Sequence, residues 1–467
     1  MKRLSGADAF FLYSERPTWP MHTGALVVLD PSGVPDFGLD KVRSRIAQGL
    51  PKLPEFMMKV KEVPFGLDLP MLVNDPDFSL DSHLHRIAVP APGGRKELGD
   101  LAGDLMEVQL DRRRPLWELW LIEGLEGGKV ALFTKVHHSI VDGVSGAGIA
   151  EILCDLEPNP PPPTDVPAEL GLPPDRIPSD VELTARGAIS AVTSPVRVGR
   201  WATGATRRLV RTLRIARPRG GRTFLDQAPP VPWVGVIGPL RRFAYESVAL
   251  DDIKEIRKAF DVKVNDVVLA IASGALRRWL LAQDALPDQP IIASVPMSIR
   301  SEGDVELGNK LTTLFTSLET HIEDPVERLR SIAEKMHAAK EIGNALRAQE
   351  IRRLSESVVP GLANLGWRAY QAANLEARVP NPSNLIVSNV PGPPIPLYTC
   401  GARILALHPV PPVVLSQGLN VTVMSYLDSV DFGFTVDREM IPDPWAMAEG
   451  VHVAVDELRT AVKSETG

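Results

Sequence analysis

The sequence predicts an α/β protein built from two folded regions, and three observations support that fold class. Strand-like alternation and helix-like periodicity are mixed along the chain on both sides of residue 158. Between Pro158 and Pro178, nine prolines occur in 21 residues, which excludes ordinary helix and central strand. A chain of 467 residues is also long enough for two or three domains of about 150 residues. We therefore expect domains at 1–157 and 223–467, joined by a proline- and arginine-rich connection at 158–222.

The elements of the first region follow from hydrophobic periodicity. Alternation predicts strands at 24–30 (GALVVLD) and at 129–136 (KVALFTKV), and helical spacing predicts a helix within 101–110. After the proline-rich stretch, residues 196–222 carry nine arginines and no acidic residue. A second α/β region then begins near Leu240.

The second region opens with a helix whose start is marked by polar residues. Asn265 supplies a side-chain acceptor at the expected cap, and Asp266 would lie in the first turn. Alternation predicts strands at 291–297 (IIASVPM) and 311–318 (LTTLFTSL).

The remaining elements also carry recognisable start signals. A long amphipathic helix is expected over 323–343, with Asp324 as its cap and Pro325 at its first position. A hairpin is expected across Asp428 and Ser429, and Asp443 with Pro444 should start a final helix.

Composition limits the class of protein. Hydrophobic residues make up 44% of the chain and charged residues 23%, values typical of a globular protein. The net charge of -7 provides no overall basic field, so we expect no nucleic-acid partner. Cys154 and Cys400 are far apart in sequence and form no CxxC pair, which supports neither a disulfide scaffold nor a cysteine zinc site. A reducing compartment fits best.

The sequence gives little indication of export or of membrane insertion. Residues 1–17 are a poor signal peptide because Asp8 interrupts the apolar stretch and no small-residue cleavage site follows. No run of 18 or more uncharged apolar residues occurs. We expect a cytoplasmic protein whose contact with membranes, if it makes any, is peripheral.

Chemistry is indicated by KVHHSIVDGVSG, which places His137, His138, Asp142 and Gly143 at the end of an apolar strand. Successive strand residues face opposite sides, so the two histidines should not share one cavity, which disfavours a shared metal ion. A single imidazole could accept a hydroxyl proton, since its ordinary pKa of about 6.5 keeps a neutral base available. The alternative is a packed histidine.

Five ordered blocks make a more specific pattern. They are LSGADAFFLYSE, RRRPLWELW, HHSIVDG, NDVVLA and SNVPGP, and HHSIVDG matches an HHxxxDG motif. Over nearly its whole length the chain resembles the bacterial wax ester synthase/acyl-CoA:diacylglycerol acyltransferase family. The resemblance implies two chloramphenicol acetyltransferase-like domains, with mixed sheets flanked by helices and an active-site channel between them. It implies no metal or redox cofactor.

The resemblance also implies roles for the motif residues. His138 would be the general base, and Asp142 would shape the site through an ion pair with an arginine. Gly143 would allow the turn beside it, whereas His137 either orients the site or packs within it. Ser139 and Ser145 are tempting nucleophiles, but GVSGAG lacks the GxSxG spacing of a nucleophile elbow. We therefore expect direct transfer without an acyl-serine.

The implied reaction moves a long-chain acyl group from acyl-CoA to a hydroxyl lipid. Diacylglycerol is the expected acceptor and triacylglycerol the product, with long-chain alcohols and wax esters second. A polyketide or glycolipid alcohol is an alternative acceptor, and a non-catalytic lipid-binding protein is an alternative of another class. The intact motif argues against the last.

The other blocks yield candidate substrate-binding residues, each with a structural alternative. Trp117 would line an acyl channel, although an aromatic beside a proline is more often core. Asn265 matches a family motif near the site but is equally explained as a helix cap. Ser388, Asn389 and Gly392 form a strand exit that could approach substrate closely, or an ordinary turn.

The arginine-rich stretch suggests contact with a membrane or lipid droplet. Four arginines can share one helical face with apolar residues between them, as expected of an interfacial basic helix; the arginines are Arg200, Arg207, Arg211 and Arg214. The alternative is a solvated connection packed against the domains.

Overall fold

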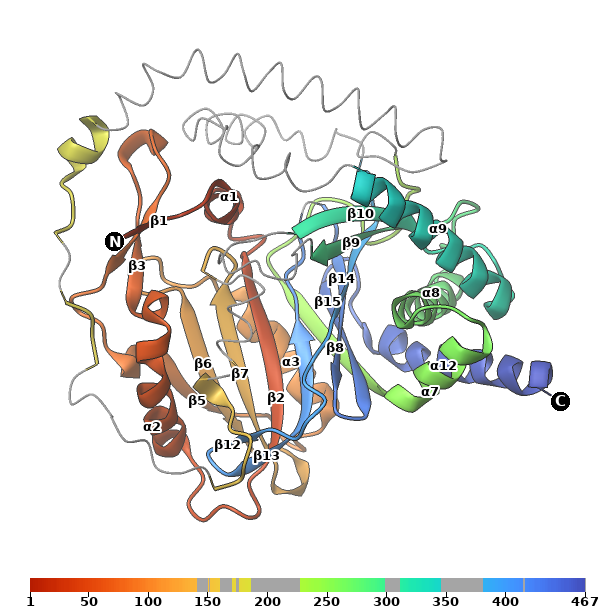
Figure 1. Ribbon diagram of the computed structural model, residues 1–467, viewed down its shortest axis with the longest axis horizontal. Helices are drawn as coiled ribbons and strands as arrows, with labels where there is room; N and C mark the ends of the chain where they lie inside the picture. The colour runs from red at the N-terminus through yellow and green to blue at the C-terminus, as the bar shows by residue number, and fades with distance from the viewer. Residues whose placement is uncertain are drawn as a thin grey trace.

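The protein has a mixed α/β fold, seen in a computed structural model that describes residues 1–140, 150, 152–159, 170–173, 176–185, 227–298, 311–345, 381–414 and 416–466. Within these ranges the strands form two six-stranded mixed sheets and one three-stranded sheet. Figure 1 shows β2, β6 and β7 in one half of the molecule and β8, β14 and β15 in the other. The α/β fold class predicted from the sequence is confirmed.

The first large sheet has the strand order β12-β13-β2-β7-β6-β5. Neighbouring strands are antiparallel except β5 and β6, which are parallel. β2 contains the strand predicted at 24–30, and β7 begins and ends one residue later than the strand predicted at 129–136. The strands are β2 (His22–Asp30), β5 (Leu84–Ala88), β6 (Trp117–Glu123), β7 (Val130–His137), β12 (Tyr398–Thr399) and β13 (Ala402–Val410).

Two strands of the first sheet come from the C-terminal part of the chain. β13 pairs antiparallel with β2 and also lies against β15 of the second sheet. The approach is close: a Cβ on Gly433 of β15 would lie 2.0 Å from the carbonyl oxygen of Pro409, so only glycine fits there. The chain from residue 398 onward thus contributes strands to both large sheets. The domain boundaries expected at 157 and 223 stay a prediction.

The second large sheet has the strand order β10-β9-β11-β14-β15-β8. β11 runs parallel to both of its neighbours, and the other pairs are antiparallel. In the β14–β15 hairpin Tyr426 pairs with Ser429, so the loop residues are Leu427 and Asp428, one position earlier than expected. The strands are β8 (Arg241–Ala249), β9 (Ile292–Ser298), β10 (Leu311–Ser317), β11 (Leu385–Val390), β14 (Leu419–Tyr426) and β15 (Ser429–Asp437).

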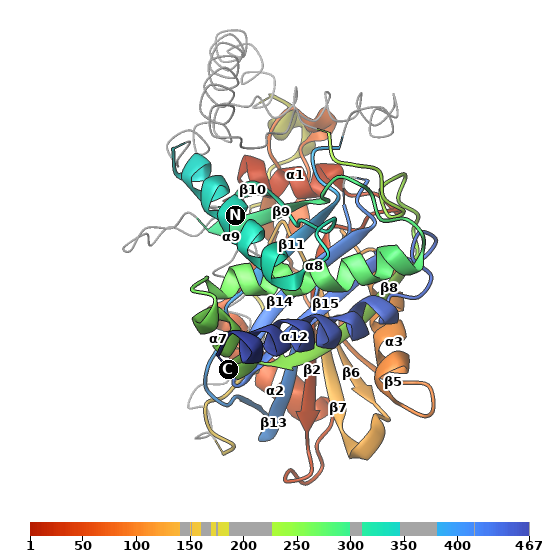
Figure 2. The same ribbon diagram turned by 90° about the vertical axis from the view of Figure 1, so that its right-hand side faces the viewer.

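Helices α7, α8, α9 and α12 flank the second sheet, and α8 and α12 run side by side across it (Figure 2). Two of their caps are as predicted: Asp324 accepts from the backbone N–H groups of Val326 and Glu327, and Asp443 accepts from that of Trp445. The helices are α7 (Leu250–Ala259), α8 (Val264–Ala282), α9 (Pro325–Ala345) and α12 (Trp445–Thr466).

The cap predicted for α8 is wrong. Lys263, not Asn265, occupies the N-cap position, and its backbone N–H donates to Oδ2 of Asp266 at 3.0 Å. A carboxylate three residues after the cap can satisfy this donor, so Asn265 is not needed for it. Asn265 lies inside the first turn, where its side chain is available for another contact.

Among the described residues, the first half of the chain also contains the helices α1, α2 and α3 and the small sheet β1-β4-β3. The helix expected within 101–110 is α3, which begins earlier and ends at Glu107. Among the described residues, no helix combines the length and the apolarity needed to cross a bilayer. The elements are β1 (Lys2–Arg3), α1 (Gly6–Ser14), α2 (Leu39–Gly49), β3 (Met58–Lys61), β4 (Met71–Asn74) and α3 (Arg95–Glu107), with 3₁₀ turns at Leu50–Lys52, Pro54–Met57, Pro64–Gly66, Leu80–Ser82 and Glu126–Gly128.

The core is divided by the first sheet. Alternation along β7 sends Phe133 into the large cluster that also fills the second half, and Leu132 into a separate cluster on the opposite face. A third, small cluster contains Trp19, Met21 and Val414. Because Phe11 of α1 and Ile386 of β11 pack against that small cluster, it joins the end of the first sheet to the second.

Candidate active site at the end of β7

The two histidines of the motif mark the point where β7 ends. His137 is the last residue of the strand and pairs with His22 of β2. The chain then turns, and the backbone N–H of Ile140 donates to the carbonyl of His137 at 3.0 Å. Residues 141–149 lie outside the described ranges, so Asp142, Gly143 and Ser145 are not placed by the structure.

His137 is fully buried and hydrogen-bonded on one side of its ring. Its Nδ1 accepts from the backbone N–H of Ser139 at 3.0 Å and lies 2.8 Å from Oγ of the same serine. Since Nδ1 accepts a hydrogen bond, this network assigns the ring hydrogen to Nε2. That nitrogen lies 3.5 Å from Oε1 of Glu15.

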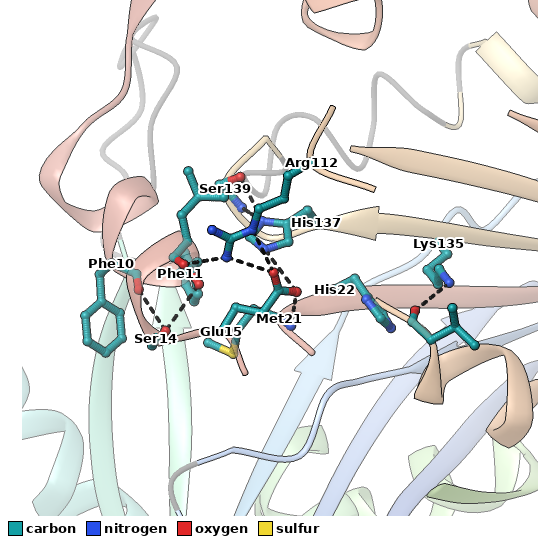
Figure 3. Close-up of polar contacts among 12 residues, drawn as sticks. Phe10, Phe11, Ser14, Glu15, Met21, His22, Arg112, Lys135, His137 and Ser139 are labelled. Atoms are coloured by element: carbon teal, nitrogen blue, oxygen red, sulfur yellow. Dashed lines mark hydrogen bonds and ion pairs between the residues drawn. The ribbon is translucent and has the colours of Figure 1, made fainter. Parts of the chain in front are cut away.

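Glu15 directly follows α1, and its carboxylate is almost completely buried, with 1% of the side chain exposed. Oε1 accepts from the backbone N–H of Met21 at 3.1 Å, and Oε2 accepts from Nη2 and Nε of Arg112 at 2.9 and 3.2 Å (Figure 3). Burial would raise the pKa of this carboxyl, but the adjacent His137 ring and the hydrogen-bonded guanidinium of Arg112 lower it to about 2. Glu15 is therefore ionised at every physiological pH.

Arg112 ties the start of the chain to the segment before β6. Besides Glu15, its Nη2 donates to the carbonyl of Leu12 at 2.6 Å, and its Nη1 donates to Glu62 at 3.0 Å. The planar guanidinium thus uses its fork of donors on a helix end and on two carboxylates.

His138 has different surroundings from its neighbour. Its backbone N–H donates to the carbonyl of Met21 at 2.9 Å, and its ring stacks on Phe11 with centroids 4.9 Å apart and planes 21° apart. The residue as a whole is partly buried. Burial, and then the nearby His137, lower its pKa to about 4. A neutral, partly accessible imidazole of this kind can accept a proton from a bound hydroxyl group.

The surroundings of His138 continue toward β11. Phe11 and Met21 belong to the same small apolar cluster as Ile386 of β11. Residues two apart on a strand share a face, so Ser388 lies on the same face of β11 as Ile386. The predicted site residue Ser388 is therefore carried on the face of β11 that meets the His138 region.

The structure brings together two further predicted residues, Asn265 and Asn389. Nδ2 of Asn389 donates to Oδ1 of Asn265 at 3.5 Å, whereas Nδ2 of Asn265 is buried and has no hydrogen-bond partner. Just after β11, the backbone N–H of Gly392 donates a hydrogen bond to Oγ of Ser425 at 3.1 Å. A Cβ on Gly392 would lie 1.8 Å from the carbonyl oxygen of Ser425, so this exit from β11 requires glycine.

Trp117 is a core residue. It is 4% exposed, its Nε1 donates to the carbonyl of Phe56 at 2.8 Å, and its ring stacks on His83 at 4.5 Å. It also lines a small apolar cavity beside Val136 and Ile152. The packing explanation of this tryptophan is the one that these contacts support.

Three residues around the histidines had no place among the candidates from the sequence: Phe11, Glu15 and Arg112. The first two lie in LSGADAFFLYSE, and the third lies in RRRPLWELW. Both blocks carried the family resemblance without indicating which side chains matter. Among the described residues, no group of three or more histidine, cysteine or acidic side chains is arranged to hold a metal ion.

The fold resembles that of condensation domains. A condensation domain of the CDA synthetase superposes with a TM-score of 0.57 at 15% identity, covering 98% of this chain and 96% of that one. At this identity the likeness shows the fold alone.

The family follows from closer comparisons. The model of the wax ester synthase/diacylglycerol acyltransferase catalytic domain matches residues 4–268, and that of the family's C-terminal domain matches 307–459. A wax ester synthase/diacylglycerol acyltransferase from Marinobacter aquaeolei superposes with a TM-score of 0.71 at 29% identity, covering 99% of this chain and 100% of that one. A putative diacylglycerol O-acyltransferase of Mycobacterium tuberculosis is 37% identical over 98% of this chain and 90% of its own length. The chain belongs to the wax ester synthase/diacylglycerol acyltransferase family.

Proposed function

We propose that this protein transfers a long-chain acyl group from acyl-CoA to the hydroxyl of diacylglycerol and so makes triacylglycerol, with long-chain alcohols as second acceptors. Membership of the family and the names of its relatives support this reaction. The observation that carries it is His138, a neutral and partly accessible imidazole at the end of β7.

In the proposed reaction His138 takes the proton of the acceptor hydroxyl while the oxygen attacks the thioester carbonyl. The tetrahedral intermediate then expels the coenzyme A sulfur. That sulfur receives the proton from the His138 imidazolium, so the base is regenerated and coenzyme A leaves as a thiol. General-base catalysis of this kind is worth about 10²- to 10⁴-fold. The chemistry requires no metal or redox cofactor.

The other candidates receive supporting roles in this proposal. Asp142 and Gly143, which lie outside the described residues, would shape the turn after His138, and His137 would hold it. Ser388, Asn389, Asn265 and Gly392 would lie on the substrate side. Two observations support these roles. Ser388 shares a face of β11 with Ile386, which packs in the same cluster as Phe11 and Met21, and Asn389 is hydrogen-bonded to Asn265.

We also propose that the protein reaches its lipid substrates at the surface of a membrane or lipid droplet. The basic segment 200–217, outside the described ranges, would provide the contact through its arginines. Deleting this segment from folded protein should weaken binding to anionic liposomes. Unchanged binding would reject this role.

The reaction is tested with purified protein, palmitoyl-CoA and either diacylglycerol or hexadecanol in lipid vesicles. Free coenzyme A is measured with and without acceptor, and mass spectrometry identifies the neutral lipid. We expect acceptor-dependent release, with triacylglycerol formed faster than wax ester. No release with either acceptor from folded protein would contradict the proposal, and faster wax ester formation would reverse the order of acceptors.

A further inference from the structure

We propose that Glu15 is the positioning residue for His138, holding the two-histidine segment in place through its carboxylate. The Glu15 carboxylate would not touch the His138 ring itself. It would act through Met21 and His137, which contact both the carboxylate and the backbone around His138. The inference rests on the proposed role of His138 as the base.

Two routes lead from the Glu15 carboxylate to the backbone around His138. Oε1 accepts from the N–H of Met21 at 3.1 Å, and the carbonyl of Met21 accepts from the N–H of His138 at 2.9 Å. Oε1 also lies 3.5 Å from Nε2 of His137, whose Nδ1 accepts from the N–H of Ser139. The residues on both sides of His138, and His138 itself, are thereby connected to one carboxylate.

The same helix end also holds the ring. Phe11 lies four residues before Glu15, and residues at this spacing share one side of a helix. Its ring stacks on that of His138 at 4.9 Å. α1 and the residue that follows it therefore constrain both the backbone and the imidazole plane of His138, and a misplacement of about 1 Å in such a group costs about 10²-fold in rate.

Only a carboxylate fits the donors around Glu15. One oxygen faces Met21 and His137, and the other faces the fork of Arg112. A glutamine has the same length but only one acceptor oxygen, so its NH₂ group would point at one of these two sets of donors.

The loop between α1 and β2 is held from the second half as well. Arg241 of β8 is buried, and its Nη2 donates to the carbonyl of Thr18. Thr18 lies between Glu15 and Met21. Arginine side chains therefore hold this loop at two points, at Glu15 and at Thr18. Arg112 anchors it from the first half of the chain and Arg241 from the second.

The test compares three variants of the full-length protein: Glu15→Gln, Arg112→Gln and Glu62→Gln. Glu62 is a matched control, because it accepts from the same arginine at 3.0 Å but is 58% exposed and faces Nη1. Steady-state kinetics with palmitoyl-CoA give kcat and KM, and thermal unfolding reports the fold. A loss of position should lower kcat and leave KM unchanged.

We expect Glu15→Gln to lower kcat at least tenfold, on the order of the penalty for a misplaced group, with KM for palmitoyl-CoA within about twofold. Arg112→Gln should lower kcat less, and Glu62→Gln should match the unmodified protein. A folded Glu15→Gln protein with kcat within about twofold would overturn the inference. If Glu15→Gln fails to fold, equal kcat values for Arg112→Gln and Glu62→Gln would overturn it.

His138→Ala separates this inference from the proposed function. If His138→Ala keeps its activity, the base has been misassigned and the proposed mechanism fails with it. If His138→Ala loses activity while Glu15→Gln keeps it, only the positioning role fails.

Discussion

His137 and His138 are adjacent in the chain, yet one ring lies in an ionic network and the other against an aromatic wall. His137 is fully buried beside the Glu15 carboxylate, which Arg112 holds in turn. His138 is partly accessible, stacks on Phe11 and has a pKa of about 4. At the end of β7, His137 therefore anchors the backbone, and His138 is the residue available for proton transfer. Charged partners hold the first ring, and the second stays neutral and able to receive a proton.

The largest effect is expected from His138→Ala. Removing the proposed base should lower kcat by about 10²- to 10⁴-fold. The thermal midpoint should change little, because the residue is not fully buried and its ring stacks on the partly buried Phe11. Coenzyme A release and thermal unfolding check the two parts, with replacement of the exposed His337 of α9 by alanine as the control. A kcat within tenfold of the unmodified protein would remove the distinction between the two histidines.

His137→Ala should act mainly on stability. The change leaves the buried Glu15 carboxylate and the N–H of Ser139 each without one partner, at an expected cost of about 2–4 kcal/mol in the free energy of unfolding. Urea denaturation measures this cost. If the loss is under about 0.5 kcal/mol, His137 is not the anchor.

The pH dependence should reflect the low pKa of His138. Because this pKa is about 4, against 6.5 for an ordinary histidine, the unfolded chain binds a proton between these values that the folded site does not. Protonation of His138 in the unfolded chain should therefore lower the free energy of unfolding as pH falls from 6.5 to 4. Above pH 6.5 the residue is neutral in both states and contributes no pH dependence.

The rate should follow the same group. The base is neutral above about pH 5, so kcat/KM should be flat from about pH 6 to 8 and should fall as pH falls through about 4. The lowered pKa also makes His138 a weaker base than an ordinary histidine, because a group with a lower pKa binds a proton less tightly. An acid limb centred near 6.5 in the kcat/KM profile would assign the proton transfer to another group.

The smallest effect is expected from Ser139→Ala. Its hydroxyl lies 2.8 Å from Nδ1 of His137, but its backbone N–H makes the other contact and survives the substitution. The serine is 3% exposed, so its Oγ faces the protein rather than a substrate. We expect kcat within about threefold, since one neutral hydrogen bond is worth only about 1 kcal/mol. A loss of 10²-fold or more would revive the acyl-serine mechanism.

The sequence predicted the parts of the fold that depend on neighbouring residues. The strands ending at Asp30 and His137, and the caps formed by Asp324 and Asp443, all follow from local periodicity and side-chain chemistry. The start of α8 was missed because Asn265 and Asp266 are both possible acceptors, and only the folded backbone shows that Asp266 serves Lys263.

What the sequence could not show depends on contacts between distant residues. Arg112 and Glu15 are 97 positions apart, and β13 joins β2 across most of the chain. Local periodicity contains no information about such pairs. The motif therefore indicated which histidines matter, whereas the carboxylate and the aromatic ring that distinguish them became visible only in the folded protein.

The most direct test of this division is NMR of the imidazole nitrogens in protein labelled with ¹⁵N-histidine, assigned with the two histidine variants. At pH 7 we predict that His137 carries its hydrogen on Nε2 and none on Nδ1, and that His138 is neutral and stays so at pH 5.5. A His137 protonated on Nδ1, or a His138 that titrates near pH 6.5, would contradict the account.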